Sequence, residues 1–518
     1  MNQFPWLTLM GLVPLVGAIV VWVLPAGLAP RAKQIALGFS LVTLALTVAA
    51  ALTFSPHSTA QFQLVEQHQW IPQFGVSYAL GVDGIALALI LMATILTPIC
   101  LLAAWHDLPG EEGTSREKNY FALMLVLETF MVGVFAATDV FLFYVFFEAM
   151  LIPVYFLIGQ YGGQRRQAAA VKFLVFSLAG GLIMLAAVIG LYTQGPGGVD
   201  GFLVQKLTGL HLSESTGRLL FLGFFIAFAV KAPMFPVHTW LPDAATEAKP
   251  ATAVLLVGVL DKVGTYGMIR FCLQLFPEAS KWATPVVIVL AVISVLYGAL
   301  LAIGQTDIMR LISYTSISHF GFIVLGIFAM TTTGGAGATL YMVNHGFTTA
   351  ALFLFAAMLV NRRGSKRIED FGGWQRVTPL LAGSFLVAGL SGLALPGLGA
   401  FIAEFLTLVG TFQRYQVAAV IATIGIILAA LYILLMFKKM MTGPKPDLAK
   451  GTPDLGAREK WVVVPLIALF LVLGFYPKPV MDIINPAIRT TLGYVGVTDP
   501  ASVVTVADPA QPTTGVTK

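Results

Sequence analysis

The chain has 518 residues, of which 58% are hydrophobic and only 11% are charged. Soluble domains carry roughly 25% charged residues, and a mean hydropathy of +0.86 leaves too little polar material to cover a soluble surface. This composition excludes a cytosolic enzyme, a secreted disulfide scaffold and a disordered chain. It predicts an all-α polytopic membrane protein.

Apolar runs long enough to cross a membrane recur along the chain, since a crossing helix needs about 20 apolar residues. The first run, Phe4 to Leu24, has no basic residue before it, so we expect a retained helix and not a cleavable signal peptide. The whole set predicts about fourteen transmembrane helices, at residues 4–24, 34–54, 84–105, 119–137, 139–159, 168–192, 218–238, 251–275, 284–303, 308–329, 338–360, 378–410, 415–438 and 460–477.

The basic residues predict the orientation of these helices. With both termini outside, most of the 30 lysines and arginines fall in loops that face inward, as the positive-inside rule requires. The net charge of +5 therefore marks loops, and we expect no nucleic-acid partner beside the lipid bilayer. The tail from Gly496 to Lys518 is rich in Thr, Pro, Ala and Val, so we expect it to be loosely ordered.

Motifs for metals and nucleotides are missing from the sequence. Cys100 and Cys272 are isolated in apolar surroundings, and neither a dinucleotide fingerprint nor a P-loop occurs. We therefore expect this chain to hold no metal and to bind no cofactor.

Ionisable side chains nevertheless lie inside the predicted spans: Glu128, Glu148, Lys172, Lys231, Asp261, Lys262 and Glu404, with His319 and His345 at similar depth. At 1.5 Å per residue Glu148 lies about 13 Å into its helix, near the centre of the bilayer. Facing lipid, the seven charges would cost on the order of 20 kcal/mol. They must face inward, pair or meet water, and such a set of titratable groups predicts a route for protons. The alternative is a set of structural ion pairs.

Four of the polar positions have simpler interpretations. Lys172 could extend to the inner surface together with neighbouring arginines, and Glu128 could bond a hydroxyl on a neighbouring helix. His238 stands near the end of a span and is as consistent with an interfacial as with a functional position. Asp139 follows a short turn and is expected to cap the next helix.

Two predicted spans contain helix breakers at membrane depth. The seventh carries Pro233 and Pro236, and the twelfth carries Pro396 and Gly397. Because proline removes a backbone hydrogen bond and clashes with the preceding turn, helices 7 and 12 are expected to be discontinuous. The breaks lie five helices apart, so helices 4–8 and 9–13 form two five-helix units of opposite sense, the pattern of an inverted repeat with ion sites near the membrane centre.

This grouping predicts the organisation of the chain. Residues 1–110 hold helices 1–3, residues 111–275 hold the first repeat, and residues 276–440 hold the second, inverted repeat. Residues 441–480 hold helix 14, and residues 481–518 form an outward-facing C-terminal tail.

The charged segments resemble the antiporter-like membrane subunits of NADH:quinone oxidoreductase, respiratory complex I. The resemblance is clearest over about residues 80–480 and rests on Phe147 to Pro153, Val230 to Pro233, His238 to Ala244, Tyr314 to His319, Asn344 to Gly346 and Glu404. Sister subunits and multisubunit sodium/proton antiporters generally have lysine at the last position, so Glu404 resembles the M-type, or chain 4, branch.

The resemblance implies roles for the matching residues. Glu148 and Lys231 would form a coupled acid–lysine pair, and Lys262 would be the central lysine of the channel. His319 and His345 would relay protons toward the second half, and Glu404 would release them outside. Glu128, Lys172, His238 and Asp261 would be accessory. The expected driving principle is pair switching, because a lysine releases its proton more readily once its carboxylate partner is neutralised or withdrawn.

The implied function is proton translocation coupled to electron transfer in partner subunits. NADH, FMN, iron–sulfur clusters and quinone are expected in those partner subunits. Sister antiporter-like subunits are expected on either side of this chain. The expected location is a bacterial plasma membrane. The alternatives are a subunit of a multisubunit sodium/proton antiporter, a subunit of a related membrane-bound hydrogenase, or a scaffold with structural charges. One position departs from the family pattern: Ala245 stands where a histidine is usual, and Lys249 lies nearby.

Overall fold

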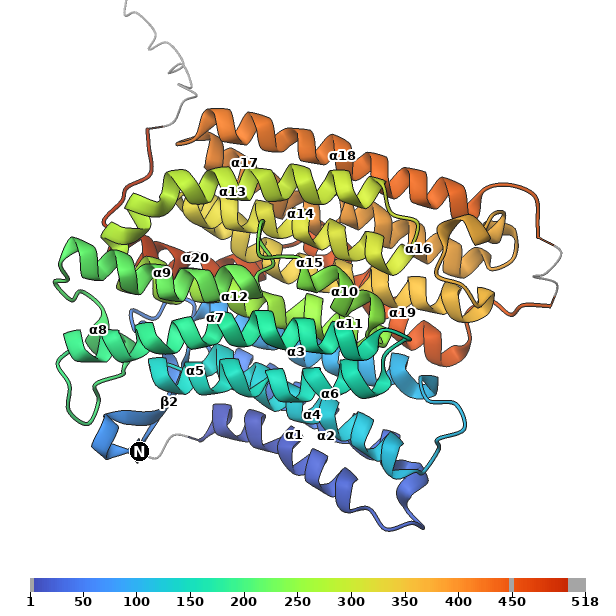
Figure 1. Ribbon diagram of the computed structural model, residues 1–518, viewed down its shortest axis with the longest axis horizontal. Helices are drawn as coiled ribbons and strands as arrows, with labels where there is room; N and C mark the ends of the chain where they lie inside the picture. Colours follow the sequence, from blue (N-terminus) through green and yellow to red (C-terminus); the bar gives the residue numbers. More distant parts are fainter. Residues whose placement is uncertain (1–3, 447–450, 502–518) are drawn as a thin grey trace, which may run out of the picture.

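The computed structural model describes residues 4–446 and 451–501, so most of the predicted loose tail lies outside the described residues. Eleven helices in the described part are long and apolar enough to cross a membrane, and a bent pair at the C-terminal end adds a twelfth span. The helices run side by side along one direction and form a single bundle (Figure 1). The chain is therefore a multi-pass membrane protein that is mostly helical.

The elements follow the predicted spans closely. The N-terminal part comprises α1 (Trp6–Val23), α2 (Ala32–Thr53), β1 (Gln63–Ile71), β2 (Val76–Val82), α3 (Gly84–Ala103) and α4 (Ser115–Ala136). The central part comprises α5 (Val140–Ala149), α6 (Leu151–Tyr161), α7 (Arg166–Gln194), α8 (Val204–Leu207), α9 (Glu214–Lys231), α10 (Trp240–Glu247), α11 (Pro250–Ala253) and α12 (Asp261–Gly267). The C-terminal part comprises α13 (Pro277–Ile303), α14 (Ile308–Phe328), α15 (Thr332–Arg363), α16 (Pro379–Gly392), α17 (Gly399–Phe412), α18 (Gln416–Met441), α19 (Ala457–Phe475) and α20 (Lys478–Val495).

Short polar residues fix where several of these helices begin. The predicted cap at Asp139 is confirmed, because its carboxylate accepts hydrogen bonds from the backbone N–H groups of Phe141 and Leu142 at 2.9 Å. Asp83 caps α3 in the same way, and Asp307 caps α14. Each cap satisfies backbone donors that a helix start leaves without a partner.

Both predicted helix interruptions are present. α9 ends at Lys231 and α10 begins only at Trp240, while α16 ends at Gly392 and α17 begins at Gly399. Counted as one span each, these two pairs bring the total to the predicted number of about fourteen. That count, the inverted repeats and the domain boundaries remain predictions.

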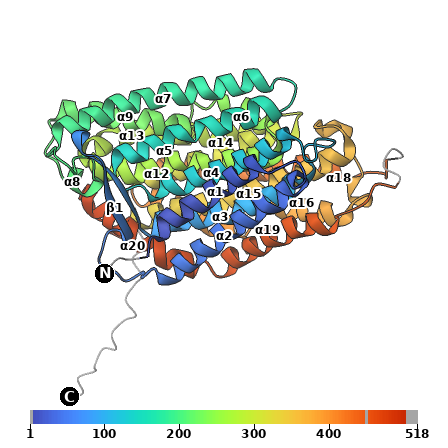
Figure 2. The same cartoon turned by 90° about the horizontal axis from the view of Figure 1, so that it is seen from below.

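A few helices make up the centre of the bundle. The continuous helix from Pro250 to Leu273 is 100% buried over its apolar window, and α14 and α15 are 94% buried. By contrast α2 is 28% and α18 is 33% buried. In Figures 1 and 2, α1, α7, α18 and α19 run along the edges of the bundle. The central helices are screened from lipid, so polar side chains there meet protein.

Two elements were not predicted. β1 and β2 form an antiparallel hairpin, so the chain is not purely α-helical. α20 lies where the C-terminal tail is predicted, bent by 67° from α19. It buries Ile484, Ile488, Leu492 and Val495 against the bundle, an apolar stripe at helical spacing. The hairpin and α20 lie at the same end of the molecule (Figure 2), which we call the hairpin end.

Candidate functional site: a buried polar row

The centre of the site is a contact between Lys262 and His345. The Nζ atom of Lys262 on α12 lies 2.6 Å from Nδ1 of His345 on α15 and donates a hydrogen bond to the carbonyl oxygen of Val257 at 2.8 Å. The ring of Phe320 lies 5.1 Å from the same ammonium group. A buried lysine is tolerable here because an acceptor, a carbonyl dipole and an aromatic face surround it.

From His345 the contacts continue into the second half of the chain. The rings of His345 and His319 are 5.2 Å apart between centroids, and Nε2 of His319 lies 3.3 Å from the hydroxyl of Tyr432. His319 also contacts the ring of Tyr341 at 5.8 Å, whose hydroxyl donates to Oε2 of Glu404 at 3.1 Å. Lys262 and Glu404 are thus joined through four helices by neighbouring polar side chains.

The spacing on α15 explains part of this alignment. Tyr341, His345 and Thr349 are four residues apart and therefore lie on one face of the helix. Thr349 Oγ1 lies 3.1 Å from Nε2 of His345. The histidine is held between two contacts, with Lys262 at one ring nitrogen and Thr349 at the other.

Glu148 and Lys231 lie in the first half of the chain, at the end of α5 and at the end of α9. The Lys231 ammonium lies 4.8 Å from the ring of Phe147 and 5.9 Å from that of Phe173. No direct ion pair joins Glu148 to Lys231 within the described residues, and both Glu148 Oε1 and Lys231 Nζ are buried without a hydrogen-bond partner. The two groups interact at longer range.

Asp261 precedes Lys262 on α12 and is close enough to both lysines of the row to interact with them. Its carboxylate is fully buried on α12, and neither oxygen has a hydrogen-bond partner in the described part of the chain. It interacts electrostatically with both Lys262 and Lys231. We call the set Glu148, Lys231, Asp261, Lys262, His345, His319, Tyr432, Tyr341 and Glu404 the polar row.

Two accessory candidates lie apart from the row. Glu128 on α4 accepts a hydrogen bond from Ser40 on α2 at 3.1 Å, which matches the simpler interpretation of a helix-packing acid. His238 is buried in the interruption before α10, where its ring lies 5.2 Å from that of Tyr297 and 6.0 Å from that of Phe235.

The remaining accessory candidate, Lys172, belongs to an ion cluster. Lys172 on α7 and Arg310 on α14 both donate to the carboxylate of Asp243 on α10 at 2.6 Å. All three side chains are about one third exposed. Lys172 therefore belongs to a partly exposed cluster in which Asp243 bonds a lysine of the first half and an arginine of the second, which differs from a lysine that only extends to the inner surface beside neighbouring arginines.

Sequence reasoning missed three members of these networks. Tyr341 and Tyr432 escaped notice because tyrosine is common in membrane proteins and carries no charge, although Tyr341 lies one helical turn before His345. Asp243 lies in the segment His238 to Ala244, which carries the family resemblance, and nothing in that segment indicates its two basic partners. The four-residue spacing between Tyr341 and His345 is the one signal in the sequence that could have found a member of this set.

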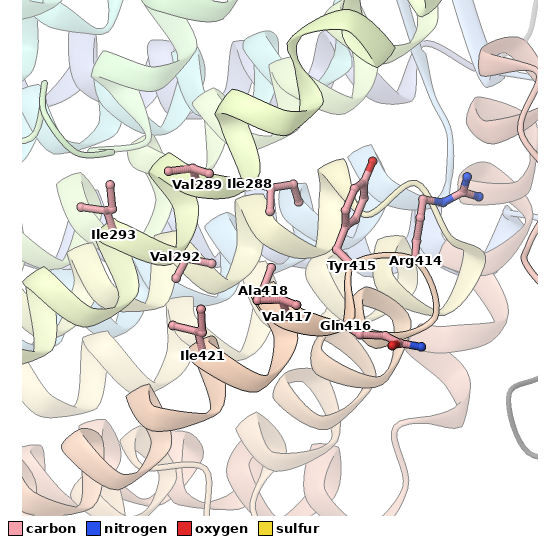
Figure 3. Close-up of a pocket in the computed structure, with 10 residues that line it drawn as sticks. All are labelled: Ile288, Val289, Val292, Ile293, Arg414, Tyr415, Gln416, Val417, Ala418 and Ile421. Carbon is pink, nitrogen blue, oxygen red and sulfur yellow. The ribbon is translucent and has the colours of Figure 1, made fainter.

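A prominent surface groove lies away from the polar row. The groove between α13 and α18 has a volume of about 620 Å³ and is lined mainly by aliphatic side chains: Ile288, Val289, Val292, Ile293, Val417, Ala418 and Ile421 (Figure 3). Arg414 at its rim extends away from these side chains (Figure 3). Its apolar lining is typical of a lipid-facing seam, and no acid, lysine or histidine among the described residues lines it.

Comparisons with known proteins agree with this architecture. The family model described as NADH:quinone oxidoreductase/Mrp antiporter, TM matches residues 137–429. The chain is 50% identical to NADH-quinone oxidoreductase subunit M of Mycobacterium tuberculosis, with 98% of each chain covered. Among solved structures, it resembles a chain of respiratory complex I from Thermus thermophilus with bound NADH, with a TM-score of 0.85 and 31% identity over 95% of this chain and 100% of that one.

A second solved structure shares the fold. A chain of the Mrp complex from Dietzia sp. DQ12-45-1b matches with a TM-score of 0.81 and 23% identity, over 96% of this chain and 100% of that one. At this identity the likeness concerns the fold alone. The family match and the whole-length similarity to subunit M show that this chain belongs to the antiporter-like membrane subunits of NADH:quinone oxidoreductase.

Proposed function

We propose that this chain translocates protons as a membrane subunit of NADH:quinone oxidoreductase and that the polar row is its path. The observation that carries the proposal is the series of side-chain contacts from Lys262 through His345, His319 and Tyr341 to Glu404, with Tyr432 as a branch at His319. A proton route needs titratable or hydroxyl groups at hopping distance in a lipid-screened interior, and these contacts supply them.

The transfer from Lys262 to His345 is the best defined step. At 2.6 Å a charged lysine donates to Nδ1 of a neutral histidine. Moving the proton along this bond leaves a neutral lysine and a charged imidazole that faces His319. From His319 the charge would continue toward Glu404, the last acid of the row, by way of Tyr341, whose ring contacts His319 and whose hydroxyl donates to Glu404.

Glu148 and Lys231 would act as the switch that drives this step. Because neither group has a hydrogen-bond partner in the described part of the chain, each is free to respond to charges delivered by a neighbouring subunit. A negative Glu148 stabilises charged Lys231, and neutralising Glu148 withdraws that stabilisation. Lys231 in its two charge states would alter the field at Asp261 and hence at Lys262.

The wider assignment follows from the relatives. We infer that electron transfer in partner subunits, which hold NADH, FMN, iron–sulfur clusters and quinone, supplies the driving signal. Sister antiporter-like subunits would flank this chain in a bacterial plasma membrane, with both termini outside. This chain would itself bind none of the cofactors.

Proton uptake per NADH oxidised, in inverted membrane vesicles that contain the whole complex, tests the path. Lys231→Ala, Glu148→Gln and Glu404→Gln should each lower this ratio while the complex still assembles. Glu128→Gln is the matched control, since Glu128 bonds Ser40 away from the row, and it should leave the ratio unchanged.

The result that would overturn the path is an unchanged proton ratio in assembled complexes that carry the Lys231 and Glu148 variants.

Co-purification separates the rival functions, because a free cation/proton antiporter would not bring flavin-bearing and iron–sulfur-bearing chains with it. Loss of assembly together with loss of pumping in every variant would favour the structural scaffold.

A further inference from the structure

A second polar column extends from Lys262 toward the hairpin end. Tyr266, Arg270 and Gln274 follow Lys262 at intervals of four residues on the same central helix, so the four side chains share one face. All four are buried. This column leaves the polar row at Lys262 and is not needed to reach Glu404.

Arg270 is held tightly in the middle of the column. Its guanidinium donates to the Asp83 carboxylate, to Oε1 of Gln274 at 3.1 Å and to the hydroxyl of Tyr266 at 3.4 Å. The rings of Phe62 and Tyr266 lie 4.9 Å and 5.6 Å from it. Hydrogen bonds and aromatic rings therefore occupy its surroundings, and the side chain is only 3% exposed.

A cavity of about 100 Å³ meets this cluster from the hairpin end. Asp83 and Arg270 line it together with the segment before β1 and the middle of α20, from Ile483 to Thr491. At about 30 Å³ per molecule it has room for roughly three waters. Solvent at this end can therefore approach Arg270, which stands between the cavity and Tyr266.

Arginine at this position is a poor relay and a good barrier. A guanidinium does not give up its proton in proteins, so the hopping that carries protons along histidine, lysine and carboxylate stops there. Each of its three nitrogens already donates one hydrogen bond, and fixed positive groups in narrow polar passages oppose the movement of protons and cations.

We infer that Arg270, oriented by Asp83, seals the polar row against protons at the hairpin end. Protons that reach Lys262 are thereby directed to His345, and protons from the hairpin end do not short-circuit to Lys262 through Tyr266. This inference rests on the proposed function, because a short circuit needs the row to reach the other side of the membrane.

Passive proton flux tests the seal without any turnover. Liposomes that contain the assembled complex receive a potassium diffusion potential with no NADH present, and the internal pH is followed. Arg270→Gln should raise the proton flux at least several-fold over wild type. The double variant Arg270→Gln/Lys262→Ala should return to the wild-type flux, since the leak then lacks its inner acceptor.

The matched control is Arg218→Gln, which removes a partly exposed arginine that pairs with Glu214 on α9, and its flux should equal that of wild type. If Arg270→Gln prevents assembly, Asp83→Asn takes its place. This variant removes the negative partner of Arg270 but keeps a side-chain oxygen that caps α3. Wild-type flux in the assembled variant overturns the seal. If Arg270→Gln has wild-type flux while Glu148→Gln abolishes pumping, the seal is wrong and the proposed proton path stands. If the Glu148 and Lys231 variants both pump normally, the proposed path itself is wrong.

Discussion

At the scale of single residues, the position of Glu148 depends on a glycine of another helix. A Cβ atom on Gly181 of α7 would overlap the Glu148 carboxylate, and one on Gly180 would meet the backbone of Ala227 on α9 at 3.2 Å. The Gly180–Gly181 pair thus lets α5 and α9 approach α7 at the same height. Two residues without side chains therefore bring the acid toward the lysine at the end of α9.

Gly181→Ala should displace Glu148 and lower the proton uptake per NADH oxidised in the same direction as Glu148→Gln. The physical reason is steric, since the added methyl group occupies the space of a carboxylate oxygen. Gly383→Ala on α16 is the control, because a methyl group there meets no atom within 4 Å. Wild-type pumping in Gly181→Ala would show that the location of this carboxylate is not critical.

The two tyrosines of the row make a separate prediction. Tyr341→Phe removes the donor to Glu404 at 3.1 Å while keeping the ring that contacts His319. Losing one such hydrogen bond is worth about 1.4 kcal/mol, which corresponds to roughly a tenfold slower transfer. Tyr432→Phe should be milder, because His319 keeps its contact with Tyr341.

Initial rates of proton uptake in vesicles, compared at equal amounts of complex, measure this effect. Losing the hydroxyl while keeping the ring changes neither helix packing nor net charge, so assembly should stay normal. Unchanged rates in the Tyr341/Tyr432 double variant would mean that protons pass from His319 to Glu404 by another route.

At the scale of the elements, short polar contacts join the helices at the end opposite the hairpin. Asp107, which follows α3, accepts a hydrogen bond from Tyr120 of α4 at 2.9 Å, and its carbonyl oxygen accepts one from Lys249 before α11 at 2.8 Å. Lys249 lies near Ala245, where the family has a histidine, and the contact shows that it brings positive charge to this joint. Burial raises the pKa of the Asp107 carboxyl above its ordinary value despite the nearby cations.

The raised pKa predicts how stability depends on pH at this joint. The folded carboxyl holds its proton to a higher pH than the unfolded one. Its contribution to the free energy of unfolding is therefore fully present below the unfolded pKa and is lost as pH rises through the folded pKa. Asp107→Asn keeps an acceptor for Tyr120 without the charge. It should raise the thermal midpoint of the complex at neutral pH, with the gain disappearing toward pH 4.

Thermal unfolding of the purified complex at several pH values measures this difference. Asp482→Asn, on the solvent side of α20, controls for the substitution itself. The assignment would be contradicted if the difference in thermal midpoint between wild type and Asp107→Asn were the same at every pH.

The membrane spans and the charged part of the row could be predicted because lipid makes both conspicuous. A charge such as Lys262 or Glu404 inside an apolar run is costly unless it has a purpose or a partner, and Pro233 and Pro396 mark breaks that any helix must show. The hairpin could not be predicted, because β1 and β2 gain their stability from pairing and not from hydropathy. α20 was missed because Lys478, Asp482 and Arg489 lower its hydropathy although its apolar stripe is intact.

Contacts that depend on three-dimensional packing were also out of reach. Nothing in the sequence says that Gly181 faces Glu148, or that Asp243 joins Lys172 to Arg310 across the two halves. The expected pair of Glu148 and Lys231 illustrates the same limit: the two groups interact at longer range, and no direct ion contact joins them within the described residues.

At the scale of the whole molecule, burial separates the helices that carry most of the polar row from those that surround them. The polar row uses α12, α14 and α15, which lie in the buried centre, together with one residue from each of α5, α9, α17 and α18. α1, α2 and α13 present aliphatic side chains outward and carry none of the row. Substitutions among the outer aliphatic residues should therefore affect lipid contact and leave proton transfer unchanged.

The fully buried helix from Pro250 to Leu273 also constrains how the protein is made. Its mean hydropathy of 1.4 is the lowest among the eleven apolar spans. Asp261 and Lys262 each cost roughly 2.5–3.5 kcal/mol near the helix centre, and Arg270 adds a third charge near its end. As a lone segment leaving the ribosome it should insert poorly, and replacing the three charges by leucine should restore insertion in a translation assay. In the cell this helix must therefore wait for neighbours that are already in the bilayer, so the charges proposed to conduct protons also set the order in which the bundle is assembled.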